Sequence, residues 1–421
     1  MSETPPSSTN PAAEDFPAST WRRYTPWAIG AAVVVVLIVL FVAFGSSRKS
    51  PDERALSELG FIKGTCSDSD TGATKPDSTC LALRAQPTLT ASQVAAAVPH
   101  LKNSDRNIEL NLANTQIDNL DALKDLDTLE SLDLTGTTVW NIDALKDMHS
   151  LKRLVLHRTE VENIAALKGL TGLQSLTLWD TRVSNLDALK NLTGLRQLDL
   201  RDTQVRDLDP LEDLPHLETL KLGGARNVRD IDALGQLTSL KTLDLNETQV
   251  DSIKALKKLR DMQALYLANT PLHDIDAIKN MSSLKTLVLD GSRVDDIDGA
   301  RGLSQMDTLV LARTQVTNID ALKGLTNLQR LNVADTRVDN IDALKDLRNL
   351  RMLNLFRTRV RNIDALKGLT NLQELYLANT PVEDVDVLKG LTGLRELVLY
   401  GTKARNVDDL KAALPKTRIV W

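Results

Sequence analysis

Leucines separated by one residue recur along most of the chain at a nearly constant interval. Because side chains alternate across a strand, both leucines of such a pair face one side of a short strand. The interval is 22 residues, apart from one step of 23, and fourteen such pairs, one of them with Val333 as its second member, precede a last apolar position near the C-terminus. The first leucines of the pairs and that last position are Leu110, Leu132, Leu154, Leu176, Leu198, Leu220, Leu243, Leu265, Leu287, Leu309, Leu331, Leu353, Leu375, Leu397 and Ile419. The pattern predicts fourteen repeats and a closing strand.

The full unit reads L-x-L-x-x-T-x-V-x-x-I-D-A-L-K-x-L-x-x-L-x-x, and the stretch NIDALKGLTNLQ occurs in it twice, at 318–329 and 362–373. One unit cannot bury its own apolar edge, so neighbouring units must stack to build a continuous core. Parallel strands lie about 4.8 Å apart, so fifteen of them would give an inner face roughly 65–70 Å long.

Two polar residues also recur at fixed positions of the repeat, and we call these positions the Thr column and the Asp column. Thr follows the second leucine by three residues in twelve repeats, with Ser292 and Ala225 as the exceptions. Its hydroxyl is expected to bond backbone groups where the chain leaves the strand. Asp precedes the Ala-Leu-Lys stretch in twelve repeats, with Ala165 and Lys254 as the exceptions. This Asp is expected to cap a short helical turn on the outer side, with the Lys three residues later offsetting its charge.

The region before the repeats divides into three parts. Residues 1–26 have no apolar period and are expected to be disordered. Residues 27–44, WAIGAAVVVVLIVLFVAF, form an uncharged run of eighteen residues, long enough for a transmembrane helix. A cleaved signal peptide is the alternative, but the long preceding segment favours an uncleaved anchor. Residues 45–103 are expected to be a linker and an N-terminal cap, with a helix at SPDERALSELG and another from Ala91 to about Leu101. The repeats then occupy 104–421.

The chain has two cysteines, Cys66 and Cys80, on either side of a polar loop. A disulfide closing a ring of about 15 residues would stabilise the fold by roughly 3 kcal/mol, and such bonds persist outside the cytoplasm. Two unrelated free thiols are the alternative. Because equal numbers of basic residues flank the apolar run, they do not decide its orientation. The cysteines favour a single-pass membrane protein whose repeats face the periplasm or the cell surface.

The repeat pattern resembles the leucine-rich repeat family over residues 104–421, and the 22-residue unit with its IDALKGLTNLQ-x-L phrasing is most similar to internalins and the protein phosphatase 1 regulatory subunit. The resemblance implies an α/β fold: a curved solenoid with parallel strands on the concave face and short 3₁₀ or helical turns on the convex face. It also implies a binding protein without chemistry of its own. The chain departs from the family in using Thr where those repeats usually carry Asn.

Composition and motifs add little chemistry. Aromatic residues make up only 3% of the chain, so the core must be aliphatic, and the net charge of −5 does not point to nucleic acid. The five histidines are scattered without metal-ligand spacing, and no cysteine lies within the repeats. The chain is therefore predicted not to be an enzyme and to need no cofactor or metal.

A partner is expected to contact the variable positions around each Leu-x-Leu pair. Five of the seven aromatic residues past residue 100 occupy these positions, although strands favour aromatic residues in any case. We distinguish a front cluster of Arg153, His157, Arg158, Trp179 and Arg201 from a back cluster of Arg330, Phe356, Arg357, Tyr376 and Tyr400, and Tyr266 lies between them. The back cluster falls within the arginine-rich stretch LRNLRMLNLFRTRVRN, which could hold an acidic protein surface or a phosphorylated glycan, or could be a solvated basic face.

The sequence thus predicts a membrane-anchored scaffold that binds a protein partner, or an envelope glycan, through its concave face and without catalysis. A cytoplasm-facing regulatory scaffold of the phosphatase-regulator type is the alternative, and membrane topology separates the two.

Overall fold

The computed structural model describes residues 51–66 and 80–421, which form one compact unit. The expected tail at 1–26 and the expected transmembrane segment at 27–44 lie outside the described residues. Within the described ranges, no helix has both the length and the apolar character needed to cross a bilayer.

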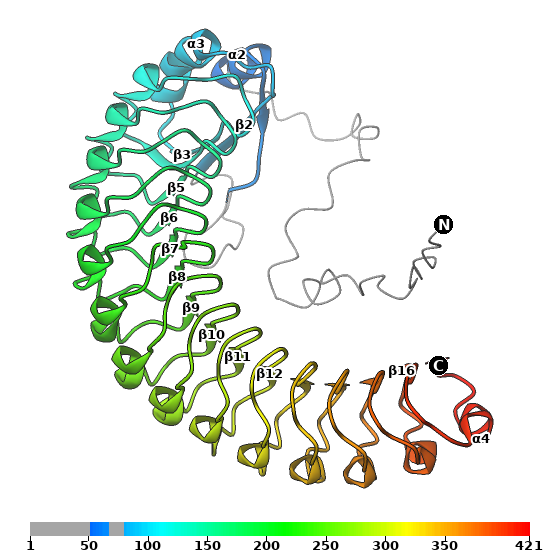
Figure 1. The fold of residues 1–421 in the computed structure, drawn as a ribbon. Coiled ribbons are helices and arrows are strands. Elements are labelled where there is room, and N and C mark those ends of the chain that lie inside the picture. The colour runs from blue at the N-terminus through cyan, green and yellow to red at the C-terminus, as the bar shows by residue number, and fades with distance from the viewer. Residues whose placement is uncertain (1–50, 67–79) are drawn as a thin grey trace, which may run out of the picture. The chain divides into compact units, whose positions relative to one another are not determined.

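The described residues form a solenoid built on one long sheet (Figure 1). Strand β1 (Phe61–Lys63) pairs antiparallel with β2, and from β2 onward each strand pairs in parallel with the next one in the sequence. The leucines are aligned across the ladder, as in the pairing of Leu154 with Leu176. The parallel strands are β2 (Cys80–Ala85), β3 (Asn107–Asn111), β4 (Leu129–Asp133), β5 (Arg153–Val155), β6 (Ser175–Thr177), β7 (Gln197–Asp199), β8 (Thr219–Lys221), β9 (Thr242–Asp244), β10 (Ala264–Tyr266), β11 (Thr286–Val288), β12 (Thr308–Val310), β13 (Arg330–Asn332), β14 (Met352–Asn354), β15 (Glu374–Tyr376), β16 (Glu396–Val398) and β17 (Arg418–Val420).

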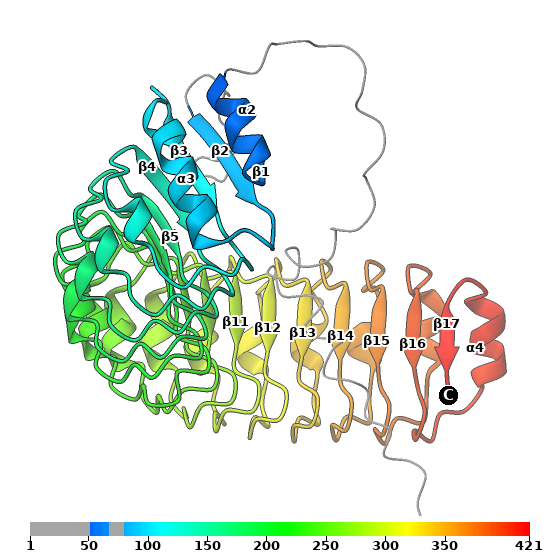
Figure 2. The ribbon, with the colours of Figure 1, turned by 90° about the horizontal axis from the view of Figure 1, so that it is seen from above.

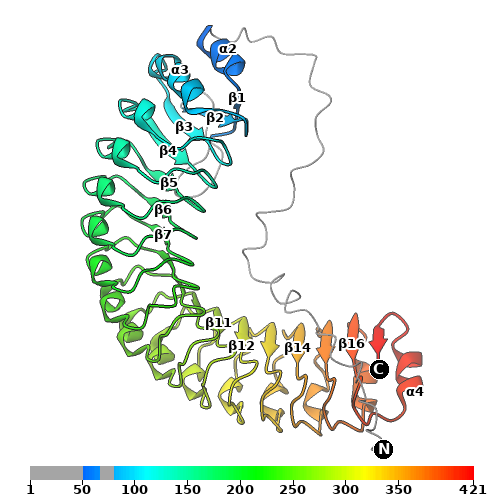
Figure 3. The same cartoon turned by 45° about the horizontal axis from the view of Figure 1, so that its top comes forward.

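Short 3₁₀ turns cover the outer side of the curve that the strands follow, and the strands line its inner side (Figure 3). This confirms the predicted arrangement of strands and turns. The turns are η1 (Asp121–Leu123), η2 (Asp143–Leu145), η3 (Ala165–Leu167), η4 (Asp187–Leu189), η5 (Asp209–Leu211), η6 (Asp232–Gln236), η7 (Lys254–Lys258), η8 (Asp276–Asn280), η9 (Asp298–Ala300), η10 (Asp320–Leu322), η11 (Asp342–Leu344), η12 (Asp364–Leu366) and η13 (Asp386–Gly390).

One aliphatic core runs through the whole described unit, from Leu56 in the first helix to Leu414 beyond the last. Both leucines of each pair and the later apolar positions are buried in it; Leu154, Leu156 and Val161, for example, have no exposed surface. Burying one such side chain contributes about 1.5–3 kcal/mol, so the stacked repeats stabilise one another through their shared apolar layers.

The threonine column has the predicted role. In all twelve repeats with Thr at this position, its Oγ1 donates to the backbone oxygen of the residue three positions earlier, at 2.6–2.8 Å. These carbonyls belong to the second apolar residue of each pair, where the chain leaves the ladder. The hydroxyl therefore satisfies a polar group that is buried beside the core.

The prediction that the Asp column caps the outer turns is wrong. That Asp is the first residue of the turn and caps nothing with its side chain, as at Asp143 in η2. The cap lies two residues earlier, where an Asn or Asp oxygen accepts the backbone N–H of the first turn residue at 2.7–2.9 Å in eleven repeats. That residue is Asp in ten of them and Ala165 in the other, and Ser252 accepts the Lys254 N–H at 3.4 Å. The Asp instead pairs with the Lys three residues later, as in Asp187–Lys190 at 2.7 Å.

The residue before the Thr column has a left-handed backbone in every repeat, with φ between 52° and 78°. We call it the turn position. Glycine fills it in only four repeats, and the other ten place a larger residue there despite the steric preference of this region for glycine. The turn position comprises Asn114, Gly136, Arg158, Asp180, Asp202, Gly224, Glu247, Asn269, Gly291, Arg313, Asp335, Arg357, Asn379 and Gly401.

The N-terminal cap contains both predicted helices, α2 (Pro51–Glu58) and α3 (Ala91–Lys102), with the Gln93 side chain accepting the Thr90 N–H at 2.9 Å. The predicted disulfide between Cys66 and Cys80 is formed. Strands β1 and β2 were not predicted, and they extend the sheet in front of the first repeat (Figure 2). At the other end, helix α4 (Val407–Ala413) replaces the 3₁₀ turn before β17.

Candidate binding surface

Two side-chain columns dominate the inner face of the sheet. The middle position is the residue between the two leucines, and the following position is the residue directly after the second leucine. Because the leucines point into the core, the middle residue points to the opposite, inner side. The following position lies where the strand ends, so its side chains form a second row along one margin of that face.

Three residues of the front cluster form a continuous stack at the following position of three successive repeats. The ring of His157 lies parallel to that of Trp179, with centroids 4.0 Å apart and planes 14° apart. The Arg201 guanidinium covers Trp179 from the next repeat, 4.1 Å from the centroid of a Trp179 ring. Both faces of the tryptophan are thus occupied by neighbours, and its Nε1–H donates to Asp202 at 2.9 Å. The stack is preorganised, which lowers the entropic cost of using it in binding.

A compact set of charges adjoins this stack on strands β7 to β9. Asp199 is buried and accepts two hydrogen bonds from the Arg201 guanidinium, and Lys221 Nζ lies 3.8 Å from the same carboxylate. Asp244 follows at the middle position of β9. Burial raises the pKa of Asp244, despite the opposing hydrogen bond from the Asn246 backbone and the charge of Arg201. Burial also lowers the pKa of Lys221. Two cations and two carboxylates therefore balance one another here.

The two remaining front residues lie outside the stack. Arg158 occupies the turn position beside His157 and is exposed, with its Nε 3.4 Å from Asp180. Arg153 begins β5 and is half-buried, on the opposite margin of the strand from His157. The structure thus brings His157, Trp179 and Arg201 together and separates Arg153 from them.

The residues of the back cluster also do not form a single group. Phe356 and Tyr400 both occupy the following position but are two repeats apart, and their ring centroids are 6.4 Å apart across the buried Ala378. The Arg357 guanidinium lies 4.9 Å from the Phe356 centroid. Burial raises the pKa of Tyr400, and the charge of Arg357 partly opposes this shift. Phe356, Arg357 and Tyr400 therefore form one aromatic and cationic group.

Tyr376 belongs to a separate acidic group on the same strands. Its hydroxyl lies 3.3 Å from a Glu374 oxygen and 3.2 Å from a Glu396 oxygen, and Arg418 pairs with Glu396 at 2.9 Å. Burial and the two carboxylates raise the pKa of Tyr376, so it remains a neutral donor. Sequence reasoning missed these glutamates, although their recurrence before the first leucine of adjacent repeats was a usable signal. Arg330 begins β13 and is exposed in that same column.

Tyr266 differs from the expectation of an exposed ring. Its side chain is only 7% exposed and packs into the face at the middle position of β10. Conversely, Trp140 is 63% exposed but lies in the loop after β4, away from the inner positions. Among the aromatic residues of the front and back clusters, Trp179, Phe356 and Tyr400 share the margin formed by the following position.

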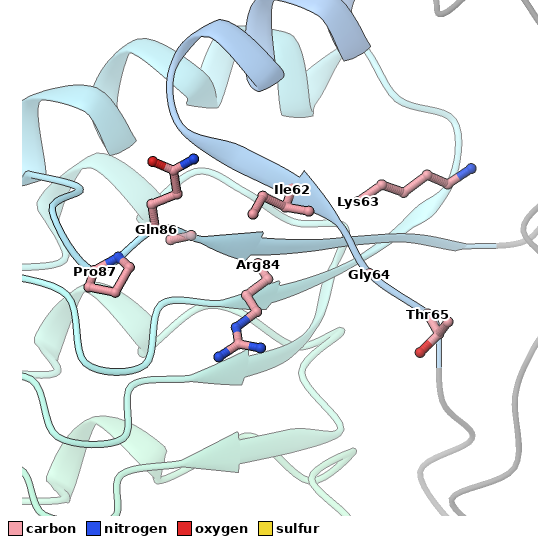
Figure 4. A pocket seen from close by; sticks show the side chains of 8 residues that line it. Ile62, Lys63, Gly64, Thr65, Arg84, Gln86 and Pro87 are labelled. Atoms are coloured by element: carbon pink, nitrogen blue, oxygen red, sulfur yellow. The ribbon is translucent and has the colours of Figure 1, made fainter. Parts of the chain in front are cut away.

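No arrangement for chemistry accompanies these surfaces in the part of the chain that the structure describes. It contains no group of three or more His, Cys, Asp or Glu side chains that could hold a metal ion. An open depression of about 650 Å³ lies at β1 and the end of β2, in the cap (Figure 4). Lys63 and Arg84 are the charged residues among its lining, which includes no carboxylate, imidazole or thiol that could act as a general base.

The family model for leucine-rich repeats (2 copies) matches residues 193–234, 348–390 and 370–412. Among curated proteins, none matches this chain.

Solved structures share the fold at low sequence identity. An internalin (inlF) from Listeria monocytogenes is 22% identical, with a TM-score of 0.60, over 88% of this chain and 93% of that one. A leucine-rich repeat protein of Leptospira interrogans is 20% identical, with a TM-score of 0.65, over 77% of this chain and 98% of that one. The ectodomain of the plant membrane receptor kinase GASSHO1/SCHENGEN3 from Arabidopsis thaliana, in complex with Casparian strip integrity factor 2, is 20% identical, with a TM-score of 0.60, over 81% of this chain and 43% of that one. The segments 193–234 and 348–412 thus match leucine-rich repeats, and the solenoid that the repeats of this chain build resembles that of an internalin.

Proposed function

We propose that this chain is a membrane-anchored scaffold whose solenoid, outside the cytoplasm, binds a protein partner through the inner face of its sheet and catalyses no reaction. The observation that carries the proposal is the placement of aromatic and arginine side chains. In a chain with only 3% aromatic residues, Trp179, Phe356 and Tyr400 all occupy the following position beside the inner face. Aromatic residues and arginine are the side chains that most often dominate the energy of protein interfaces.

The fold supports a binding role in two further ways. The described core is aliphatic and continuous from end to end, so the inner side chains are not needed to hold the solenoid together. The plant ectodomain with the same fold was solved in complex with Casparian strip integrity factor 2. Comparable use of the fold here would place a partner along the strands, with an envelope glycan as the alternative ligand.

The location rests on two features of the N-terminal region. The uncharged run at 27–44 is long enough to anchor the chain in a bilayer, and the disulfide between Cys66 and Cys80 suits an oxidising compartment. A reporter enzyme that is active only outside the cytoplasm, fused after Trp421, should be active in intact cells. An inactive reporter together with free thiols at both cysteines would favour the cytoplasm-facing regulatory scaffold instead.

The binding face can be tested with a photo-crosslinking aromatic amino acid in place of Tyr400 in the full chain. Irradiation of native membranes should give a discrete protein adduct from this position and none from position 345, where Lys345 is exposed beside an outer turn. A discrete glycan adduct would point to the alternative ligand. Equal adducts from both positions would rule out the inner face as the binding site.

A further inference from the structure

The margin next to Phe356 and Tyr400 carries a second feature, a concentration of positive charge. We define the basic flank as the segments 312–317, 334–339, 356–361, 378–383 and 400–405, which begin at the following position of five successive repeats. They hold seven Arg and Lys residues against three Asp and Glu residues. The corresponding segments of the nine earlier repeats hold seven against nine, in a chain with a net charge of −5. Positive charge is therefore gathered at one end of one margin.

The backbone brings these segments close together. Each follows the carboxyl end of its strand, and because the strands are parallel, all of the segments lie along the same edge of the sheet (Figure 2). A second ladder of hydrogen bonds joins them beyond the sheet: the Arg337 N–H donates to Val316 at 3.2 Å and the Arg359 N–H donates to Val338 at 2.8 Å. Arg337 and Arg359 are thus stacked neighbours at the same position of adjacent repeats.

Within one repeat, Arg357, Arg359 and Arg361 alternate with Thr358 and Val360. The Thr and Val are buried and the three arginines are exposed. All three arginine side chains are therefore presented to solvent, Arg357 from the left-handed turn position and the other two from the segment that follows it.

Acidic side chains neutralise only part of this charge. Arg357 lies 3.7 Å from Asp335, and Arg405 pairs with Glu383 at 2.9 Å. By contrast, Arg337, Arg359 and Arg361 make no ion pair within residues 51–66 and 80–421. Three neighbouring guanidinium groups that form no ion pair are a surface suited to an anionic ligand, because Arg binds carboxylates through two parallel hydrogen bonds.

From this charge and the adjoining rings we propose that the partner docks an acidic peptide segment on the basic flank, with an apolar side chain of that segment against Phe356 and Tyr400. This inference rests on the proposed function and names the chemistry of the partner. A peptide fits both features at once, because it can supply carboxylates to the guanidinium groups and an apolar side chain to the rings. The negative net charge of the whole chain also opposes long-range attraction of a polyanion.

The chain offers a matched control for the test. The test variant carries Arg337→Ser, Arg359→Ser and Arg361→Ser. The control variant carries Arg182→Ser, Arg206→Ser and Arg293→Ser, which remove the same charge from exposed residues at the same positions of other repeats. A random dodecapeptide display library is selected on the full chain, and the enriched peptides are measured on both variants.

Enriched peptides should combine Asp and Glu with an aromatic or aliphatic residue. Their affinity should fall about tenfold or more in the test variant and less than about twofold in the control, and added salt should weaken binding. Phe356→Ala should weaken the same peptides without changing their salt dependence. Four outcomes would each overturn the inference. The enriched peptides could lack acidic residues, or no peptide could be enriched. The two variants could lose the same affinity, or polyphosphate or anionic vesicles could displace the peptides. If the adduct from position 400 persists undiminished in the test variant, the inner face remains the binding site and only the acidic segment is wrong.

Discussion

At the residue scale, each repeat is held by a few positions whose roles are local. The Thr hydroxyl bonds a buried carbonyl, the Asx side chain two residues before the Asp column starts the outer turn, and the turn position takes a left-handed backbone. The last of these conflicts with residue preference, because most repeats place a residue with a Cβ where glycine would be favoured.

Replacing Glu247 by Gly should stabilise the chain. Glu247 has a φ of 59°, a conformation that costs a residue with a side chain roughly 1 kcal/mol or more. Its exposed pairing with Arg226 is long, at 3.9 Å, and contributes little. We expect a gain of about 0.5–1 kcal/mol in the free energy of unfolding, measured by urea titration.

Gln249→Gly is the control, because Gln249 is equally exposed two residues later but is not in the left-handed region. It should lose about 0.5–1 kcal/mol. If the two substitutions changed stability in the same direction, the conformation of the turn position would not be the cause.

Replacing Asp244 by Asn should stabilise the chain in a pH-dependent way. Burial raises the pKa of Asp244 above its ordinary value of 3.8, so the folded chain holds this proton to higher pH than the unfolded chain does. Stability therefore falls as the pH rises from about 3.8 through the raised pKa, and the loss remains above it. Asparagine occupies the same middle position at Asn332 and Asn354, where its oxygen accepts the backbone N–H two residues later.

The Asp244→Asn variant should therefore match the parent chain near pH 3 and exceed it near pH 7 in urea titrations. If the difference in the free energy of unfolding between the two chains did not change with pH, ionisation of Asp244 would not be what lowers the stability of the parent chain at neutral pH.

At the element scale, the repeats were predictable and the cap was less so. The strands and turns could be predicted because the same apolar pattern recurs in every repeat. The role of the Thr column could be predicted because a buried carbonyl needs a hydrogen-bond donor. The Asp column was assigned the wrong role because a 3₁₀ turn can begin at any of several adjacent polar residues, and Asn141 and Asp143 both fit a cap. Strands β1 and β2 escaped prediction because their pairing is unique and leaves no periodic signal.

The candidate surface shows the same division. The repeat pattern in the sequence indicated which positions face the inner side of the sheet. It did not indicate how the side chains at these positions pack against one another. Tyr266 is buried while Tyr400 is half-exposed, and the two carboxylates beside Tyr376 come from its own strand and the next one. These outcomes depend on side-chain packing between repeats, which the sequence of one repeat does not contain.

The disulfide should act mainly on the cap. Cys66 follows β1 and Cys80 begins β2, so the bond ties the segment after β1 to the start of β2. Cys66→Ser combined with Cys80→Ser should destabilise this end by about 3 kcal/mol. In a stacked array the loss should appear as an early, separate step of the urea transition, with the remaining repeats unfolding as before.

Treating the parent chain with a thiol reductant should reproduce the same early step and should leave the double variant unchanged. A uniform shift of the whole transition would contradict a role confined to the cap.

At the scale of the whole molecule, stability comes from contacts between neighbours only, so the number of repeats is not fixed by the fold. Deleting residues 318–361 joins Thr317 to Asn362 without changing the local sequence, because 318–329 and 362–373 are identical. The shortened chain should fold with the same circular dichroism per residue and unfold cooperatively. It should also lose the peptides that bind the basic flank, since Arg337, Phe356 and Arg359 go with the deleted segment. Aggregation or loss of strand signal would show that the two repeats are structurally indispensable.

The duplicated twelve-residue stretch also affects how the gene can change by recombination. Where two stretches of a gene encode the same twelve residues in the same frame, misaligned recombination can remove or add the 44 residues from the start of one copy to the start of the other, and we expect the product to fold. Proteins that result from such an event would differ in length by two repeats and in the number of repeats that carry the arginines of the basic flank. The part of the scaffold most open to gain or loss by this route is the part to which we assign partner choice.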